Sequence, residues 1–211
     1  MRREFLRTLA TPTVQAAQAR YYGTSRVPAP GPVTQSLGSE EQAFIAARDS
    51  FYLATVSENG WPYVQHRGGP KGFLRVVGPA QLAFADYNGN RQLLTTGNVQ
   101  AHRRVALFLM DYAARERLKI LGHARVLPAT EAGEWIPQLA VPPRTVVERV
   151  FLIDVVGFDW NCPKYITPRF TAEEVTAMTA PLRERIAELE RALAERRSAQ
   201  GSVVAARLPE T

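Results

Sequence analysis

Polar side chains gather in residues 86–98, directly before an apolar run that is typical of a buried strand. An Asn-Gly-Asn turn ends at Asn90, which could cap a short helix whose first turn holds Arg91 and Gln92. Free backbone N–H groups at a helix N-terminus attract phosphate, and an arginine adds a forked pair of charged donors. Neutral donors follow close behind, at Thr95, Thr96 and Asn98. The segment indicates an anion site, although an ordinary helix cap beside a surface arginine shows the same pattern.

A second polar segment, QHRGGPKG at residues 65–72, ends a predicted strand with cationic side chains and then glycines. Glycine has no side chain, so a flat ring can approach the main chain closely there. The side chains that could contact a ligand are Gln65, His66, Arg67 and Lys71. Since these two segments follow the second and the fourth predicted strands, we expect them to meet at one end of a barrel and to hold a phosphate and a planar heterocycle together.

The elements that must position these segments are mainly strands. Apolar runs with strand periodicity predict strands at residues 51–57, 61–66, 73–77, 81–85, 105–110, 118–127 and 150–156. Gly122 lies inside the sixth of them and indicates a bulge or a close backbone approach. Six or seven antiparallel strands with short hairpins predict a mainly β (α+β) fold, a small barrel whose closure removes exposed sheet edges. Ser39 and Gln42 have the spacing of a capping box for a flanking helix over residues 40–48.

The composition divides the chain into four parts. Residues 1–38 are basic, with Glu4 as their one acid, and are predicted to form an N-terminal arm; residues 39–171 form the barrel. Residues 172–198 are predicted to form a long amphipathic C-terminal helix, which packs on its own domain or on a partner, and residues 199–211 a tail. The apolar face of that helix consists of Val175, Met178, Leu182, Ile186, Leu189 and Leu193.

Composition narrows the possible partners. The formal charge is +6, which is compatible with an anionic ligand, but no aromatic and basic platform indicates nucleic acid. Cys162 is the only cysteine, and the three histidines lack ligand spacing, so we expect neither a disulfide nor a metal. No apolar run approaches the roughly 18 residues of a membrane span. Polar residues interrupt the stretch after Arg2 and Arg3, which argues against a twin-arginine export signal and favours a cytoplasmic protein.

A family resemblance rests on five segments in this order: FYLATVSENGWPYVQHRGGPKGF, LAFADYNGNRQLLTTGN, RVALFLMDY, RLKILGHARV and FDWNCPKYITPRF. Together they resemble the pyridoxamine 5′-phosphate oxidase-like family of FMN-binding split barrels over roughly residues 40–171. Within that family they are similar to the branch that carries GNRQ-type and FDWNCPxxITPRF-type segments. The resemblance implies a split barrel and a homodimer, with each of two FMN molecules bound where the subunits meet.

The resemblance also implies roles for particular residues. Gln65, His66, Arg67 and the main chain toward Lys71 would line the flavin. The FMN phosphate would contact Asn90, Arg91 and Gln92. Arg117 would reach over from the other subunit, and Trp160 and Asn161 would close the site.

The expected function is that of an FMN-dependent oxidoreductase acting on an unidentified small molecule. The biosynthetic oxidase has an Arg-Lys pair where this chain has Arg91 and Gln92, and its Arg-Leu-x-Pro ending is not evident here. These departures argue against oxidation of pyridoxamine phosphate itself. The alternatives are a non-catalytic flavin-binding or stress-response protein, a split barrel that binds haem or F420, and a nucleic-acid binder that uses the basic arm. No acid, base or nucleophile can be assigned from the sequence.

Overall fold

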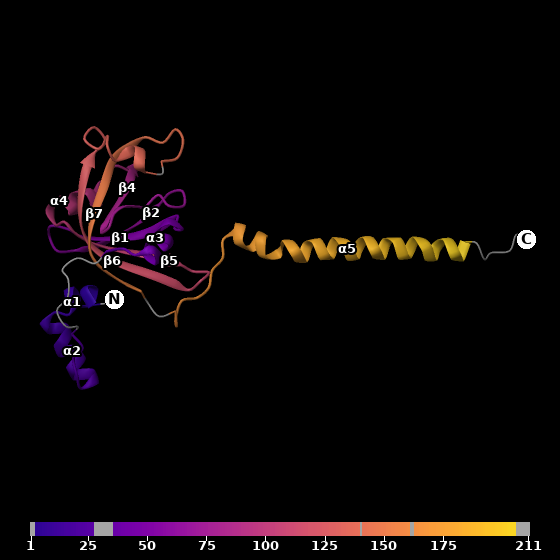
Figure 1. Cartoon of the computed structure of the whole chain (residues 1–211), viewed down its shortest axis with the longest axis horizontal. Coiled ribbons are helices and arrows are strands. Elements are labelled where there is room, and N and C mark those ends of the chain that lie inside the picture. Colours follow the sequence, from indigo (N-terminus) through magenta and orange to yellow (C-terminus); the bar gives the residue numbers. More distant parts are fainter. Residues whose placement is uncertain (1–2, 28–35, 140, 161–162, 206–211) are drawn as a thin grey trace, which may run out of the picture. The chain divides into compact units, whose positions relative to one another are not determined.

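The computed structural model describes residues 3–27, 36–139, 141–160 and 163–205. The chain divides into two units, Met1–Thr167 and Pro168–Thr211. The first unit contains all seven strands of the described chain and the second contains the long helix α5, Ala172–Ala205 (Figure 1). This helix continues past residue 198, where the sequence pattern placed the start of a tail.

The first unit is built on one antiparallel sheet with the strand order β2-β1-β5-β6-β7-β4-β3. The strand bounds are β1 Ser50–Val56, β2 Pro62–Gly68, β3 Arg75–Gly78, β4 Gln81–Tyr87, β5 Arg104–Asp111, β6 Glu116–Pro128 and β7 Val147–Trp160. The predicted mainly β fold, with flanking helices and a long C-terminal helix, is confirmed.

Aromatic contacts across the interior show that the sheet curls around one core. Strands β1 and β4 are separated by β5, β6 and β7 in the strand order, yet the Phe51 and Phe84 rings lie 5.3 Å apart in edge-to-face geometry. Phe84 also stacks on Phe151 of β7 at 4.8 Å. All three side chains are at most 1% exposed. The curled sheet therefore packs its inward faces against each other, as a barrel does.

Short helices flank the barrel: α1 Arg3–Leu9, α2 Pro12–Tyr22, α3 Ser39–Ala46, α4 Leu94–Ala101 and the 3₁₀ turn η1 Ile136–Gln138. The N-cap of α3 is Gly38, so the predicted Ser39 cap was wrong by one residue. The reason is that Glu41, three positions after Gly38, accepts a hydrogen bond from the Gly38 N–H at 2.9 Å. In the arm, Phe5 of α1 is buried, and the Lys119 ammonium lies 4.8 Å from its ring centroid.

The sheet has a register shift at Gly122, which confirms the bulge predicted there. A Cβ atom at this position would lie 2.6 Å from Ile153 Cγ2 and 2.8 Å from the Asp154 carbonyl oxygen. The Gly122→Ala substitution should therefore lower the free energy of unfolding by about 1–3 kcal/mol, measured by urea denaturation. Gly133→Ala is the matched control, because a Cβ atom at Gly133 meets nothing within 4 Å. Equal stability of the two variants would contradict the close approach.

Candidate functional site

A polar pocket of about 200 Å³ lies between β2, β4, β7 and the segment that leads into α4. Residues 63, 65 and 67 contribute from β2 because alternate residues of a strand share a face. The charged residues that line the pocket are three arginines and one aspartate: Arg67, Arg91, Arg149 and Asp86. The other lining residues are Tyr63, Gln65, Tyr87, Gly89, Asn90, Gln92, Leu93, Leu94, Thr95 and Thr96. This excess of cations favours an anionic ligand.

A carboxylate bridge organises the floor of this pocket. Asp86 Oδ1 accepts from Arg67 Nη1 at 2.5 Å, and Asp86 Oδ2 accepts from Arg149 Nε at 2.8 Å. Asp86 is 7% exposed, so both arginines are held by a nearly buried anion. Arg149 Nη2 also donates to Glu148 Oε2 at 2.7 Å. The two guanidinium groups are therefore fixed in place before any ligand binds.

The electrostatics of the lining groups follow from these contacts. Burial by itself would lower the pKa of Arg149, but hydrogen bonds and charge interactions with Asp86 and Glu148 outweigh it and raise that pKa above its ordinary value. Burial raises the pKa of Tyr87, which keeps its phenol neutral and able to donate a hydrogen bond at physiological pH. Arg149 therefore carries its charge in the pocket.

Arg67 has further capacity to bind a ligand. Its guanidinium carbon lies 5.4 Å from the centroid of Phe151 and 5.7 Å from that of Phe84. Its Nε atom is buried and has no hydrogen-bond partner within the residues that the structure describes. A buried N–H without an acceptor is costly, so an acceptor at this position would stabilise the site.

The segment before α4 has an uncommon backbone. Arg91 has φ 60° and Leu93 has φ 55°, both in the left-handed region that non-glycine residues seldom adopt. A right-handed helix cannot include such residues, so α4 begins at Leu94, and the expectation that Arg91 and Gln92 form its first turn was wrong. Asn90 instead accepts a hydrogen bond from the Gln92 N–H through Oδ1 at 3.1 Å. Such local strain is typical of ligand-binding loops.

Two hydrogen bonds fasten α4 to the sheet. Thr95 Oγ1 donates to Gln65 Oε1 at 2.6 Å, which joins the two segments that the sequence singled out. The Gln65 oxygen is occupied, so this side chain offers its amide N–H groups to a ligand. Asn98 Nδ2 donates to Thr55 Oγ1 at 2.9 Å in the interior, and Asn98 is not among the pocket residues. Asn98 thus positions α4.

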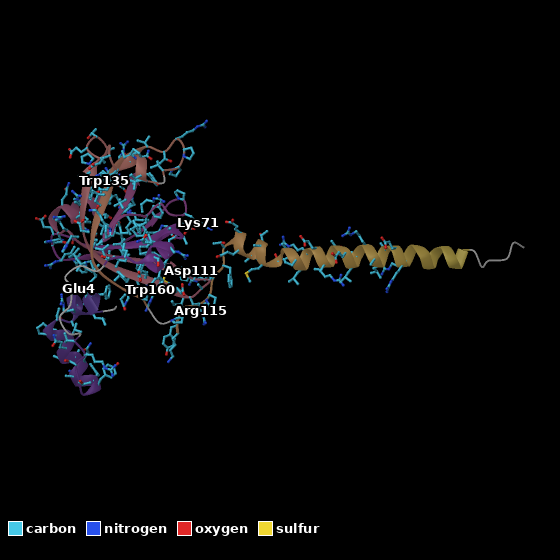
Figure 2. The ribbon with its side chains drawn as sticks, viewed as in Figure 1. Glu4, Lys71, Asp111, Arg115, Trp135 and Trp160 are labelled. Carbon is cyan, nitrogen blue, oxygen red and sulfur yellow. The ribbon has the colours of Figure 1, made fainter. Side chains whose placement is uncertain are left out.

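The remaining predicted residues lie elsewhere. His66 projects from the other face of β2, where its ring meets Tyr52 edge-on at 5.7 Å. Lys71 follows β2 in a turn, and Figure 2 shows it well separated from Trp160. Trp160 Nε1 donates to Glu41 Oε1 at 2.8 Å, and its ring packs edge-on against Phe44 at 4.8 Å. Asn161 lies outside the described residues.

Arg117 lies on β6, away from the polar pocket. Its guanidinium carbon is 5.3 Å from the Phe108 ring centroid, and its buried Nε has no hydrogen-bond partner in the described chain. Phe108 borders a hollow that is mainly apolar and that Phe5 and Leu9 of α1 also line. Along β1, β2, β5 and β6 its lining residues are Tyr52, Ala54, Val64, Ala106, Leu107, Ile120 and Leu121. Arg117 therefore stands beside an apolar face of the sheet.

Sequence reasoning missed Asp86 and Arg149 as site residues. A signal existed for Asp86, because a carboxylate ends the apolar run directly before the Asn-Gly-Asn turn. Arg149 gave no local signal, since it reaches the pocket only because β7 pairs with β4 and sets Arg149 opposite Asp86.

Within the described ranges, no group of three or more His, Cys, Asp or Glu residues could hold a metal ion. None of the helices described there has the length and apolar character needed to cross a membrane.

The strand order and the pocket define a small split-barrel protein with a polar pocket rich in arginine. The chain matches the family model described as pyridoxamine 5′-phosphate oxidase over residues 37–152, more than half of its length. It belongs to the pyridoxamine 5′-phosphate oxidase-like family, which confirms the resemblance predicted from the five segments.

Solved structures similar to this chain share little sequence with it. A protein from Lactobacillus delbrueckii described as a pyridoxamine 5′-phosphate oxidase is 21% identical, with a TM-score of 0.46, and the match covers 60% of this chain and 95% of that one. An FMN-binding protein from Syntrophomonas wolfei is 12% identical, with a TM-score of 0.43 and coverages of 57% and 83%. An F420 reductase is 17% identical, with a TM-score of 0.44 and coverages of 58% and 98%. No curated protein matches the chain.

Proposed function

We propose that this chain is an FMN-dependent oxidoreductase that acts on a small molecule and holds the FMN phosphate in the polar pocket. The observation that carries the proposal is the donor set: three arginines, the Thr96 hydroxyl, the Gln65 amide and the N-terminus of α4 around about 200 Å³. A phosphate dianion suits forked guanidinium donors and free backbone N–H groups. The buried Arg67 Nε, which has no hydrogen-bond partner among the described residues, also favours a ligand with anionic acceptor oxygens.

The size of the pocket decides which part of FMN it suits. Ligand sites that enclose a drug-sized molecule measure about 300–1,000 Å³, so a cavity of about 200 Å³ suits the phosphate and sugar chain and not the tricyclic ring. We propose that a second subunit completes the surface for the ring. The apolar hollow along β1, β2, β5 and β6 supports this homodimer, because large apolar faces are usually covered by a partner. Arg117 beside that hollow is the residue we expect a partner to contribute.

The residues described above would bind and orient the group. Arg91, Arg149 and Arg67 would neutralise the phosphate, Thr96 and the Gln65 amide would add neutral donors, and Asp86 would keep two of the arginines in position. A bound flavin would supply hydride and electron transfer. The electron donor and the substrate would approach from outside this polar pocket, and no acid or base among the described residues is assigned to them.

Spectroscopy of the full chain tests the proposal. We expect the purified protein to be yellow or to take up added FMN with quenching of flavin fluorescence, and mass spectrometry should identify the released chromophore as FMN. A colourless protein that takes up no FMN would overturn the proposal, as would a bound haem or F420, which the absorbance spectrum reveals. If the protein is yellow but shows no turnover with any of the electron donors and acceptors tested, the FMN site is supported and the oxidoreductase activity is contradicted.

A further inference from the structure

The second unit presents an apolar stripe along α5. The six side chains of the stripe, Val175, Met178, Leu182, Ile186, Leu189 and Leu193, are between 44% and 65% exposed. A helix of 34 residues with this many exposed apolar side chains gains stability when the stripe is covered. The stripe is therefore a candidate interaction surface.

The spacing of the stripe specifies the kind of partner. Val175, Leu182 and Leu189 follow one another at intervals of seven residues, and so do Ile186 and Leu193. This is a heptad pattern with Leu182 and Leu189 at d positions and Ile186 and Leu193 at a positions. A β-branched residue at an a position between leucines at d, as at Ile186, favours two parallel strands. Pro181 lacks a backbone N–H and limits the regular repeat to the helix that follows it. The pattern thus fits one further helix of the same kind.

The flanking charges allow that further helix to be a second copy of α5. In this register Arg185 is a g position and Glu190 is the e position five residues later, the two positions that meet between parallel strands. Two identical helices would therefore place opposite charges against each other twice. Within one chain Arg185 contacts Glu188 at 2.8 Å, an exposed pair that is easily exchanged for another.

We propose that α5 pairs with α5 of a second copy of this chain, as a parallel, in-register coiled coil over residues 182–193. The parallel orientation rests on the proposed homodimer of barrels, because it keeps both barrels at the same end of the paired helices. Tethering to paired barrels also compensates for the short length of the coil by raising the local concentration of the helices. The pairing itself does not depend on flavin.

Cysteine cross-linking of the full chain tests the pairing. In a Cys162→Ser background, which removes the only native thiol, Leu182→Cys and Leu189→Cys should each form disulfide-linked dimers on mild oxidation. Arg191→Cys, on the opposite face of the same helix, should stay uncross-linked. If Leu182→Cys and Leu189→Cys behave like the Arg191→Cys control, the pairing is wrong and the stripe packs on its own barrel or on another protein. Cross-linking only between Leu182→Cys and Leu193→Cys chains would show antiparallel helices and overturn the proposed orientation.

Charge exchange provides an independent test. In the Leu189→Cys chain, Glu190→Arg should reduce cross-linking because Arg185 then faces another cation, and adding Arg185→Glu should restore it. Failure of the double variant to recover, with the helical circular dichroism unchanged, would contradict the proposed arrangement. FMN uptake is measured on the same proteins. Loss of cross-linking with normal FMN uptake counts against the coiled coil alone, whereas normal cross-linking without FMN uptake counts against the proposed function alone.

Discussion

Asp86→Asn should lower the free energy of unfolding of the barrel by about 3 kcal/mol, the lower end of the range for breaking a buried ion pair. Asparagine has nearly the same size but no charge, so Arg67 and Arg149 would lose their shared anion while their side chains remain only 15% and 19% exposed. Arg149 keeps Glu148 as a partner, which limits the loss. Urea denaturation followed by tryptophan fluorescence measures the effect.

Glu148→Gln is the matched control for Asp86→Asn. Glu148 contacts the same Arg149, but its side chain is 28% exposed, compared with 8% for Asp86. Water can replace part of the contact between Glu148 and Arg149, so Glu148→Gln should lower the free energy of unfolding by less than about 1 kcal/mol. If the two variants were equally stable, the bridge would not organise the pocket. Asp86→Asn should also weaken FMN binding, because Arg67 and Arg149 would no longer be held in position. This loss of FMN affinity should be larger than the loss caused by Glu148→Gln.

Arg91→Ala should weaken FMN binding by roughly 1.5–3 kcal/mol, which is about 10- to 150-fold in Kd, if Arg91 contacts the phosphate. Arg91 is exposed and lines the pocket, so its removal should leave the barrel folded. A guanidinium group supplies two parallel charged donors to a phosphate, and neither water nor alanine replaces them. Fluorescence titration of FMN measures the change.

Arg144→Ala is a closely matched control for Arg91→Ala. Arg144 is also exposed, has φ 61°, and does not line the pocket. Both substitutions remove one positive charge at a left-handed position, so they share the backbone effect and the change in net charge. Only Arg91→Ala should weaken FMN binding beyond the small long-range effect of charge. Equal affinities in the two variants would exclude a phosphate contact by Arg91.

Part of the site could be predicted because the relevant signals are local. Strand periodicity located the hairpins, and the polar residues after the second and the fourth strands indicated the segments that Thr95 and Gln65 join. The same periodicity placed His66 on the other face from Gln65 and Arg67, although sequence reasoning grouped all three. The start of α4 could not be predicted, because the left-handed conformations of Arg91 and Leu93 are stabilised by their surroundings and not by their residue types.

By itself the sequence determined the strands, the family and the heptad stripe of α5, since each depends on residue types at short intervals. The tertiary structure alone decided that Arg149 reaches the pocket and that Asp86 joins it to Arg67. Those contacts depend on the register between β4 and β7, whose residues 86 and 149 are far apart in the chain. Register is set by the packing of the whole sheet around its core, so no local pattern specifies it.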